Sequence, residues 1–277
     1  MLSAKGKVTE CRQTIGKLLK AKTDPDFQVS LRHGASQNAI NAGNLEEASR
    51  LLREIESILP ETSHETEHRL RWYHQKSFLK LRARKYDMGL LWVQEAIPLI
   101  ETVAPGCITG WLLVNHAWFL TEIAAGQDDE EDRRFLIKKA ETDYQHAIEH
   151  AEREDPKQML HFQSRLPQFA KIGLALMYLG CRESCDNSRL GIISKDVSLE
   201  DIRKAKNVIA SLDKEGMLCN ISKFLLKVVK SCLLYRQGSY QQAYDLALEA
   251  RDFATKHSFG GFANFANSIV NYLQDYV

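Results

Sequence analysis

The chain has 277 residues, of which 44% are apolar and 26% charged, and its formal net charge is +1. These values are typical of a folded globular protein, and the near-neutral charge argues against general affinity for nucleic acid. Only 15 Gly and 6 Pro leave little room for a turn-rich all-β fold. Lysine interrupts the longest apolar stretch (FLLKVV, 224–229), so no membrane span is predicted.

The N-terminal segment has no continuous apolar stretch of the kind that a secretory signal needs. Six cysteines in such a chain are expected to be reduced thiols rather than a disulfide framework. We therefore expect an intracellular, cytoplasmic protein.

Apolar residues recur at three- and four-residue spacing along almost the whole chain, which predicts an all-α fold. The expected helices, in chain order, are 6–22, 27–42, 45–58, 64–84, 86–102, 108–126, 130–153, 158–181, 198–213, 215–237, 240–257 and 260–276. Pro98 and Pro167 fall inside two of these ranges and are expected to kink or shorten their helices. The sequence SLED at 198–201 is a capping-box pattern, and 182–197 lacks periodicity and is expected to be a surface loop.

Three distant stretches share one pattern, namely AGNLEEASRLLREI (42–55), ARKYDMGLLWVQEA (83–96) and RQGSYQQAYDLALEA (236–250). Each has a short polar break followed by an apolar helical run. A small residue early in the run (Ala48, Gly89 or Ala243) is expected to let the second helix of a hairpin approach the first. A helical hairpin cannot cover its own apolar stripe, so repeated hairpins are expected to stack.

These stretches resemble the tetratricopeptide repeat (TPR) family. Gly238, Tyr240, Ala243 and Ala250 match the glycine, tyrosine and two alanines of that motif. KIGLALMYLG (171–180) resembles the end of a first helix, and KAETDYQHAIEHAERED (139–155) a second helix. Repeats starting near 29, 70, 112, 166 and 224 are longer than the ~34 residues of the standard repeat. They are similar to the kinesin light chain type of TPR and to the irregular, RNA-binding interferon-induced TPR proteins.

The resemblance implies one domain, a right-handed α-solenoid of about five helix pairs with a flanking helix at each end. The expected pairs lie near 27–58, 64–102, 108–153, 158–213 and 215–257, and the capping helices at 6–22 and 260–276. The last helix has an apolar stripe that could instead dock a second copy of the chain, giving a homodimer.

The first helices of TPR pairs line a concave groove, and eight polar residues are expected there. They are His33, Gln37, Arg71, His74, Gln75, Arg82, Asn115 and His116. Such a strip could hydrogen-bond an extended peptide and pair with its carboxylates. The alternative is that they are semi-buried polar residues with satisfied hydrogen bonds. His33 and Gln37 stand where the family's carboxylate clamp has Lys and Asn, so binding of chaperone C-termini is not predicted.

The stretch RLRWYHQKSFLKLRARK (69–85) has seven basic residues and no acidic one. A basic patch is expected from Arg69, Lys76, Lys80, Arg84 and Lys85. It favours an acidic or phosphorylated protein partner, or RNA, because interleaved aromatic side chains can stack on unpaired bases. The alternative is a solvated face whose cations are balanced by acids on adjacent helices.

No nucleotide-binding, hydrolase or metalloprotease motif occurs in the sequence. Cys181 and Cys185 have too few neighbouring ligands to predict a zinc site. We therefore predict no catalytic residue, no metal and no cofactor. The expected function is a non-enzymatic scaffold that binds a partner peptide or helix. RNA binding through 69–85 and a structural subunit are the alternatives.

Overall fold

The computed structural model describes residues 13, 16–18, 24–83, 85–153, 165–182, 191–192, 197–215, 218–257 and 259–277. These residues form α2 (Pro25–Asn41), α3 (Leu45–Ile58), η2 (Leu59–Glu61), α4 (Glu65–Arg82), α5 (Tyr86–Ile100), α6 (Cys107–Ala124), α7 (Glu130–Glu152), α8 (Leu166–Tyr178), α9 (Leu199–Lys214), α10 (Asn220–Arg236), α11 (Tyr240–Lys256) and α12 (Gly260–Gln274). One antiparallel pair of two-residue strands, β1 (Cys181–Arg182) and β2 (Gly191–Ile192), joins Cys181 to Ile192. The predicted all-helical class is confirmed apart from this short pair.

Most expected helix boundaries are close to those observed, and the differences have local causes. Pro167 lies in the first turn of α8 and begins that helix, where its missing N–H leaves no bond unmade. Pro98 lies within the last turn of α5, which ends two residues later at Ile100. Ser198 caps α9 as expected, since its Oγ accepts from the N–H of Asp201 at 3.0 Å. Most of the predicted helix 6–22 and most of the predicted loop 182–197 lie outside the described residues.

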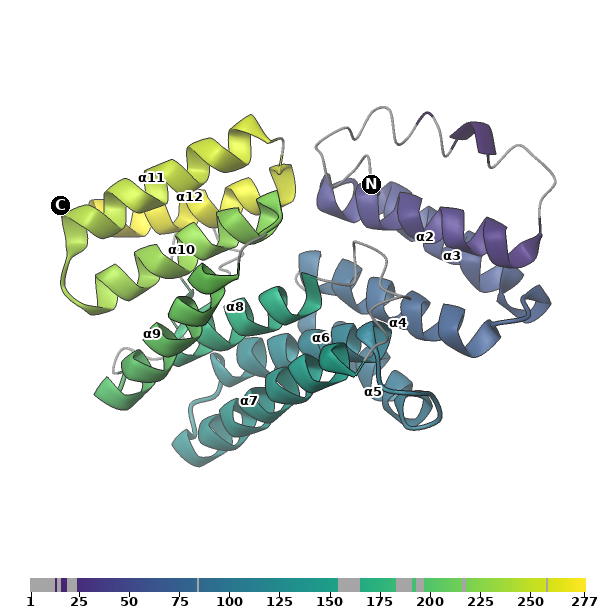
Figure 1. The fold of residues 1–277 in the computed structure, drawn as a ribbon, viewed down its shortest axis with the longest axis horizontal. Coiled ribbons are helices and arrows are strands. Elements are labelled where there is room, and N and C mark those ends of the chain that lie inside the picture. The colour runs from purple at the N-terminus through teal and green to yellow at the C-terminus, as the bar shows by residue number, and fades with distance from the viewer. Residues whose placement is uncertain are drawn as a thin grey trace.

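The helices pack sequentially with their neighbours. Each odd-numbered helix from α3 to α11 packs against the helix before it, and the even-numbered helices α2, α4, α6, α8 and α10 contact one another in series. Figure 1 shows the result as an arc in which α4, α6 and α8 lie toward the middle and α5, α7 and α9 lie outside. The last helix, α12, packs against α11 and also contacts α2, so the first and last of the helices named above touch.

The apolar stripe of α12 is used within the chain. Phe265, Ile269 and Leu273 are buried in the main apolar core. This packing fits the expected capping role, because these three side chains of the stripe lie in the core.

The three repeated stretches share one backbone turn. In each, an N–H just past the first helix donates to a carbonyl five residues earlier, the long bond of a Schellman cap. The bonds are Asn44 N to Ala39 O at 2.9 Å, Lys85 N to Lys80 O at 2.9 Å, and Ser239 N to Leu234 O at 3.0 Å. Gly43 and Gly238 adopt left-handed φ values of 77° and 76°, which only glycine reaches without strain.

The small residues of the repeated pattern do not all have the expected role. Ala243 is buried, and its carbonyl accepts from Ser231 Oγ at 2.7 Å, so it does bring α11 close to α10. Gly89 instead faces the neighbouring hairpin, because a Cβ there would collide with the Phe119 ring of α6. The expectation that Gly89 serves contact with its own partner helix α4 is therefore wrong.

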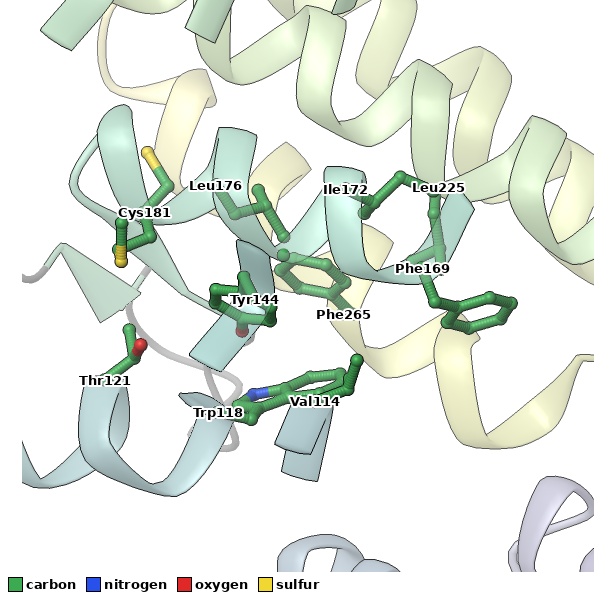
Figure 2. A pocket seen from close by; sticks show the side chains of 12 residues that line it. Val114, Trp118, Thr121, Tyr144, Phe169, Ile172, Leu176, Cys181, Leu225 and Phe265 are labelled. Carbon is green, nitrogen blue, oxygen red and sulfur yellow. The ribbon is translucent and has the colours of Figure 1, made fainter. Parts of the chain in front are cut away.

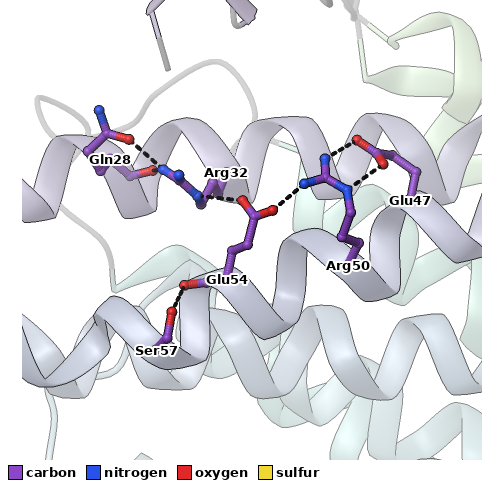
Figure 3. A network of polar contacts seen from close by, with 6 residues as sticks. All are labelled: Gln28, Arg32, Glu47, Arg50, Glu54 and Ser57. Atoms are coloured by element: carbon purple, nitrogen blue, oxygen red, sulfur yellow. Dashed lines mark hydrogen bonds and ion pairs between the residues drawn. The ribbon is translucent and has the colours of Figure 1, made fainter. Parts of the chain in front are cut away.

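A polar network on the surface joins α2 to α3 (Figure 3). Arg32 Nε bonds Glu54 Oε2 at 3.0 Å, and Glu54 also pairs with Arg50, which bonds Glu47 through Nη2 at 2.7 Å. Exposed pairs of this kind contribute about 0–1 kcal/mol each, so burial between the hairpins supplies most of the stability. Among the described helices, none combines the length and apolarity that crossing a membrane requires.

Candidate interaction surface

Five of the eight polar residues expected in the groove are buried and bonded inside the protein. Gln75 of α4 reaches back to His33 of α2: its Nε2 donates to His33 O at 2.8 Å, and its Oε1 lies 2.9 Å from His33 Nδ1. The amide oxygen can only accept, so His33 Nδ1 is the donor. Both side chains are at most 4% exposed.

The same bridge recurs one hairpin later. Asn115 of α6 places Nδ2 at 3.0 Å from both the main-chain O and the Nδ1 of His74 on α4. Here the ring nitrogen accepts, so His74 carries its proton on Nε2. We call the two arrangements the amide–histidine bridges. Each joins a first helix to the first helix of the preceding hairpin.

Two further members of the expected groove also bond within the protein. His116 is 2% exposed and places Nδ1 at 2.8 Å from Asp143 Oδ2 on α7. Gln37 donates from Nε2 to Asn41 Oδ1, one turn on in α2, at 3.2 Å. The histidines, Gln75 and Asn115 therefore lie between helices, where they cannot contact a partner in this conformation. Stacked first helices bury their facing sides, and polar side chains there must find partners inside.

Burial has a large effect on the two bridged histidines. Desolvation, reinforced by the nearby positive charge of Arg71, lowers the pKa of His33 and of His74 to about 3. His33 Nε2 is buried and has no hydrogen-bond partner among the residues that the structure describes, which adds to the cost of charging the ring. Both rings are therefore neutral at physiological pH.

One member of the expected basic patch, Lys76, packs against the second helices. Lys76 Nζ lies 3.9 Å from the Trp72 ring centroid and 3.7 Å from that of Trp92 on α5, and 3.8 Å from Glu56 on α3. Desolvation lowers the pKa of this ammonium group. Arg69 pairs with Glu65 within α4. Lys76 thus stabilises contacts with α3 and α5, and Arg69 is paired within its own helix, which fits the balanced-charge alternative.

The remaining members of the expected basic patch are Lys80, Lys85 and Arg84. Lys80 is half-buried and Lys85 is exposed, at the end of α4 and just beyond it. Arg84 lies outside the described residues.

The opposite side of α4 carries Arg71, Phe78 and Arg82, at i, i+7 and i+11. All three are half-buried, and the Arg82 guanidinium lies 5.6 Å from the Phe78 ring centroid. This is the side turned away from Lys76 and the second helices. Of the eight expected groove residues, Gln37, Arg71 and Arg82 are thus half-buried rather than buried, although Nε and Nη2 of Arg82 are themselves buried.

Aromatic rings continue across the inner side from α4 to α8. Phe78 stacks on His74 with ring centroids 6.2 Å apart, His74 lies 5.5 Å from Trp111 of α6, and Trp111 lies 5.2 Å from Phe169 of α8 in an edge-to-face contact. We call these four residues the aromatic row. His74 is buried, whereas Phe78, Trp111 and Phe169 are half-buried and partly accessible.

An apolar cavity of about 30 Å³ lies beside the aromatic row (Figure 2). Its walls come from α6, α7, α8, β1, α10 and α12, and Figure 2 shows Trp118 and Phe169 among the side chains around it. The volume is about that of one water molecule in the liquid, far below that of a metabolite site. This cavity is therefore too small to hold a metabolite.

Sequence analysis gave no role to Trp111 or Phe169, which are partly buried and pack at the edge of the main apolar core. The i, i+7 spacing of Trp111 and Trp118 matches that of Arg71 and Phe78, and could have indicated one partly exposed stripe per first helix. In the part of the chain that the structure describes, no three His, Cys, Asp or Glu side chains come together as metal ligands do.

Comparison with known proteins found no matching family model and no matching curated sequence.

Proposed function

We propose that this chain is a non-enzymatic interaction scaffold, a TPR-like right-handed solenoid that binds a helix or peptide of a partner protein along its inner side. The observation that carries the proposal is the aromatic row. It crosses three consecutive hairpins and is flanked by Arg71 and Arg82.

Partly exposed aromatic side chains next to arginine have the composition of a protein-binding hot spot. Trp111 and Phe169 are held by their edge-to-face contact, so little side-chain entropy is lost when a partner covers them. The half-buried Arg71 favours a partner with carboxylate or phosphate groups beside its apolar residues, and Arg82, whose Nε and Nη2 are buried, lies on the same side of α4. The partner class is therefore an acidic or phosphorylated segment with apolar anchors.

The test is affinity capture from a cell lysate with quantitative mass spectrometry, comparing wild type with the double variant Arg71→Glu, Arg82→Glu and with Trp111→Ser. Each variant should capture at least tenfold less than wild type of any protein bound through the inner side. This difference corresponds to about 1.4 kcal/mol of binding free energy. The matched control is Arg203→Glu, because Arg203 lies on the outer helix α9 and pairs only locally with Glu200. Circular dichroism checks that each variant is folded. Equal capture by wild type and both inner-side variants would remove this surface from the function.

RNA is the second candidate ligand, because arginine beside aromatic rings also suits stacking on unpaired bases. Contacts to phosphates release counterions, so RNA binding should weaken steeply with salt. Fluorescence anisotropy with a single-stranded RNA oligomer at two salt concentrations tests this. Tight binding at low salt that Arg71→Glu, Arg82→Glu abolishes, together with loss of captured proteins after ribonuclease treatment, would favour RNA over a protein partner.

A further inference from the structure

A second and larger cavity is lined by the outer helices α7 and α9 and by the end of α8. Its volume is about 440 Å³, within the range of about 300–1,000 Å³ that is typical of small-molecule sites. Apolar side chains (Ile137, Met177 and Val197) line it together with six charged ones. The size and the mixture of apolar and charged groups distinguish this cavity from the small apolar one beside the aromatic row.

One end of the cavity is positively charged. Arg133 and Arg134 of α7 both pair with the carboxylate of Glu130, and Arg134 does so through Nε at 3.0 Å. Lys138 lies one turn beyond Arg134, and its ammonium group has no ion-pair partner within the described part of the chain. Three cations against one carboxylate leave two positive charges at this end.

The other end of the cavity carries hydrogen-bond acceptors. Glu141 Oε1 accepts from the buried Tyr178 hydroxyl at 2.5 Å and lies 3.4 Å from Lys204 Nζ on α9. Asp201 lies 4.0 Å from the same ammonium group. Burial, followed by the hydrogen bond to Glu141, raises the pKa of Tyr178, so the phenol keeps its proton. Two carboxylates against one lysine leave one negative charge at this end.

The two ends are separated by a length that suits a small molecule. From Arg134 to Glu141, α7 rises roughly 10 Å, at about 1.5 Å per residue. A matching ligand therefore has an anionic group at one end and hydrogen-bond donors at the other. Carboxylates only accept, so the donors on the ligand are hydroxyl or amino groups.

We propose that this cavity binds a small organic phosphate, namely a phosphate monoester whose organic part carries hydroxyl or amino groups. Near neutral pH a phosphate monoester carries a charge of about −1.5 to −2, which matches the two positive charges left at the end formed by Arg133, Arg134 and Lys138. Guanidinium groups bind phosphate oxygens through paired N–H donors, and lysine adds a point charge. The hydroxyl or amino groups donate to Glu141 and Asp201.

Glu130 has a distinct role in this proposal. In the free protein its carboxylate is the shared anionic partner of Arg133 and Arg134, so a bound phosphate competes with it for the same N–H donors. Removal of the Glu130 charge should therefore strengthen phosphate binding, which loss of a residue that only supports the fold would not do.

Isothermal titration calorimetry on the full chain tests the proposal with five probes. They are adenosine 5′-monophosphate, glucose 6-phosphate, inorganic phosphate, adenosine and glucose. At least one of the two esters should bind, and its unphosphorylated counterpart should bind about tenfold more weakly or less, because the charged hydrogen bonds to phosphate are lost. No binding of either ester would overturn the proposal. Equal affinity for inorganic phosphate and for the esters would mean an adventitious ion only, and would overturn it as well.

Variants place the binding in this cavity. The double variant Arg134→Gln, Lys138→Gln should weaken binding of the ester about tenfold or more. The matched control is Lys139→Gln, because Lys139 is exposed on the same helix and does not line the cavity. Glu130→Gln should tighten binding about threefold, since it removes the competing carboxylate. Glu141→Gln should weaken binding of the ester and leave the affinity for inorganic phosphate unchanged.

The cavity and the inner side can be tested separately. Circular dichroism confirms that each variant is folded, and a folded Arg134→Gln, Lys138→Gln variant with wild-type affinity would contradict the site. The inner-side double variant Arg71→Glu, Arg82→Glu should bind the ester as wild type does, because neither residue lines this cavity. Loss of ester binding in that folded variant would place the phosphate at the inner side instead and overturn the assignment.

Discussion

Mild acid should destabilise this protein through two residues, His33 and His74. Both rings are buried in the amide–histidine bridges, and burial together with the charge of Arg71 lowers each pKa from 6.5 to about 3. The unfolded chain therefore binds protons at these positions in a pH range where the folded protein does not.

The sign and size of the effect follow from proton linkage. Because the folded-state pKa is depressed, the contribution is fully present above pH 6.5 and is lost as pH falls from there toward 3. Between about pH 8 and pH 5, each histidine accounts for a loss of about 2 kcal/mol, since one pH unit below the unfolded pKa corresponds to about 1.4 kcal/mol. The pair together accounts for about 4 kcal/mol, a large part of the 5–15 kcal/mol typical of a domain.

Urea denaturation followed by circular dichroism at about pH 8, 6.5 and 5 measures this loss. The variants His33→Asn and His74→Asn start from lower stability, but each should lose about 2 kcal/mol less than wild type on acidification. The control is His64→Asn, because His64 is exposed at the start of α4. A wild-type loss below about 1 kcal/mol, or variants that keep the full wild-type slope, would refute the claim that both rings are buried and neutral.

Three substitutions test the packing. Gly89→Ala should cost about 1–3 kcal/mol of unfolding free energy by urea titration, because its methyl group would meet the fully buried Phe119 ring; a neutral result would mean that α5 and α6 are not in contact there. Gly238→Ala should cost about 1–2 kcal/mol by the same titration, from left-handed backbone strain alone, since nothing lies within 4 Å of the new Cβ. Trp72→Phe should cost about 1 kcal/mol or more, because the indole Nε1–H donates to Leu52 O at 2.9 Å inside the core; thermal melts with no shift would exclude that bond.

The helices could be predicted because residues at or next to each helix end determine where that end lies. Gly43 and Gly238 end helices in left-handed turns, and Ser198 begins one with its side chain. Pro167 was expected to kink or shorten the helix 158–181, and α8 begins one residue before it, at Leu166. Gly89 was assigned to the wrong neighbour because spacing shows that a close approach occurs, not which helix approaches.

The surface was harder to predict than the fold, because α4 is polar on more than one side. Lys76 was expected at an open surface, yet it lies between two tryptophan rings with Glu56 nearby. His74 was expected to face a partner, yet Asn115 bonds it from the next hairpin. Polarity alone does not indicate exposure when a helix is covered on three sides, because long-range partners decide which polar groups are buried.

The amide–histidine bridges also connect the fold to the proposed surface. An apolar contact between stacked helices tolerates sliding, whereas each amide must meet both a ring nitrogen and a main-chain carbonyl at about 3 Å. The bridges thereby fix the position of α4 against α2 and of α6 against α4. That position sets where Phe78 and Trp111 lie relative to each other, with His74 between them as a member of both a bridge and the aromatic row. Replacing Asn115 with Leu should therefore disturb the aromatic row as well as the stacking. The disturbance should appear as a change in tryptophan near-ultraviolet circular dichroism under conditions where helix content is unchanged.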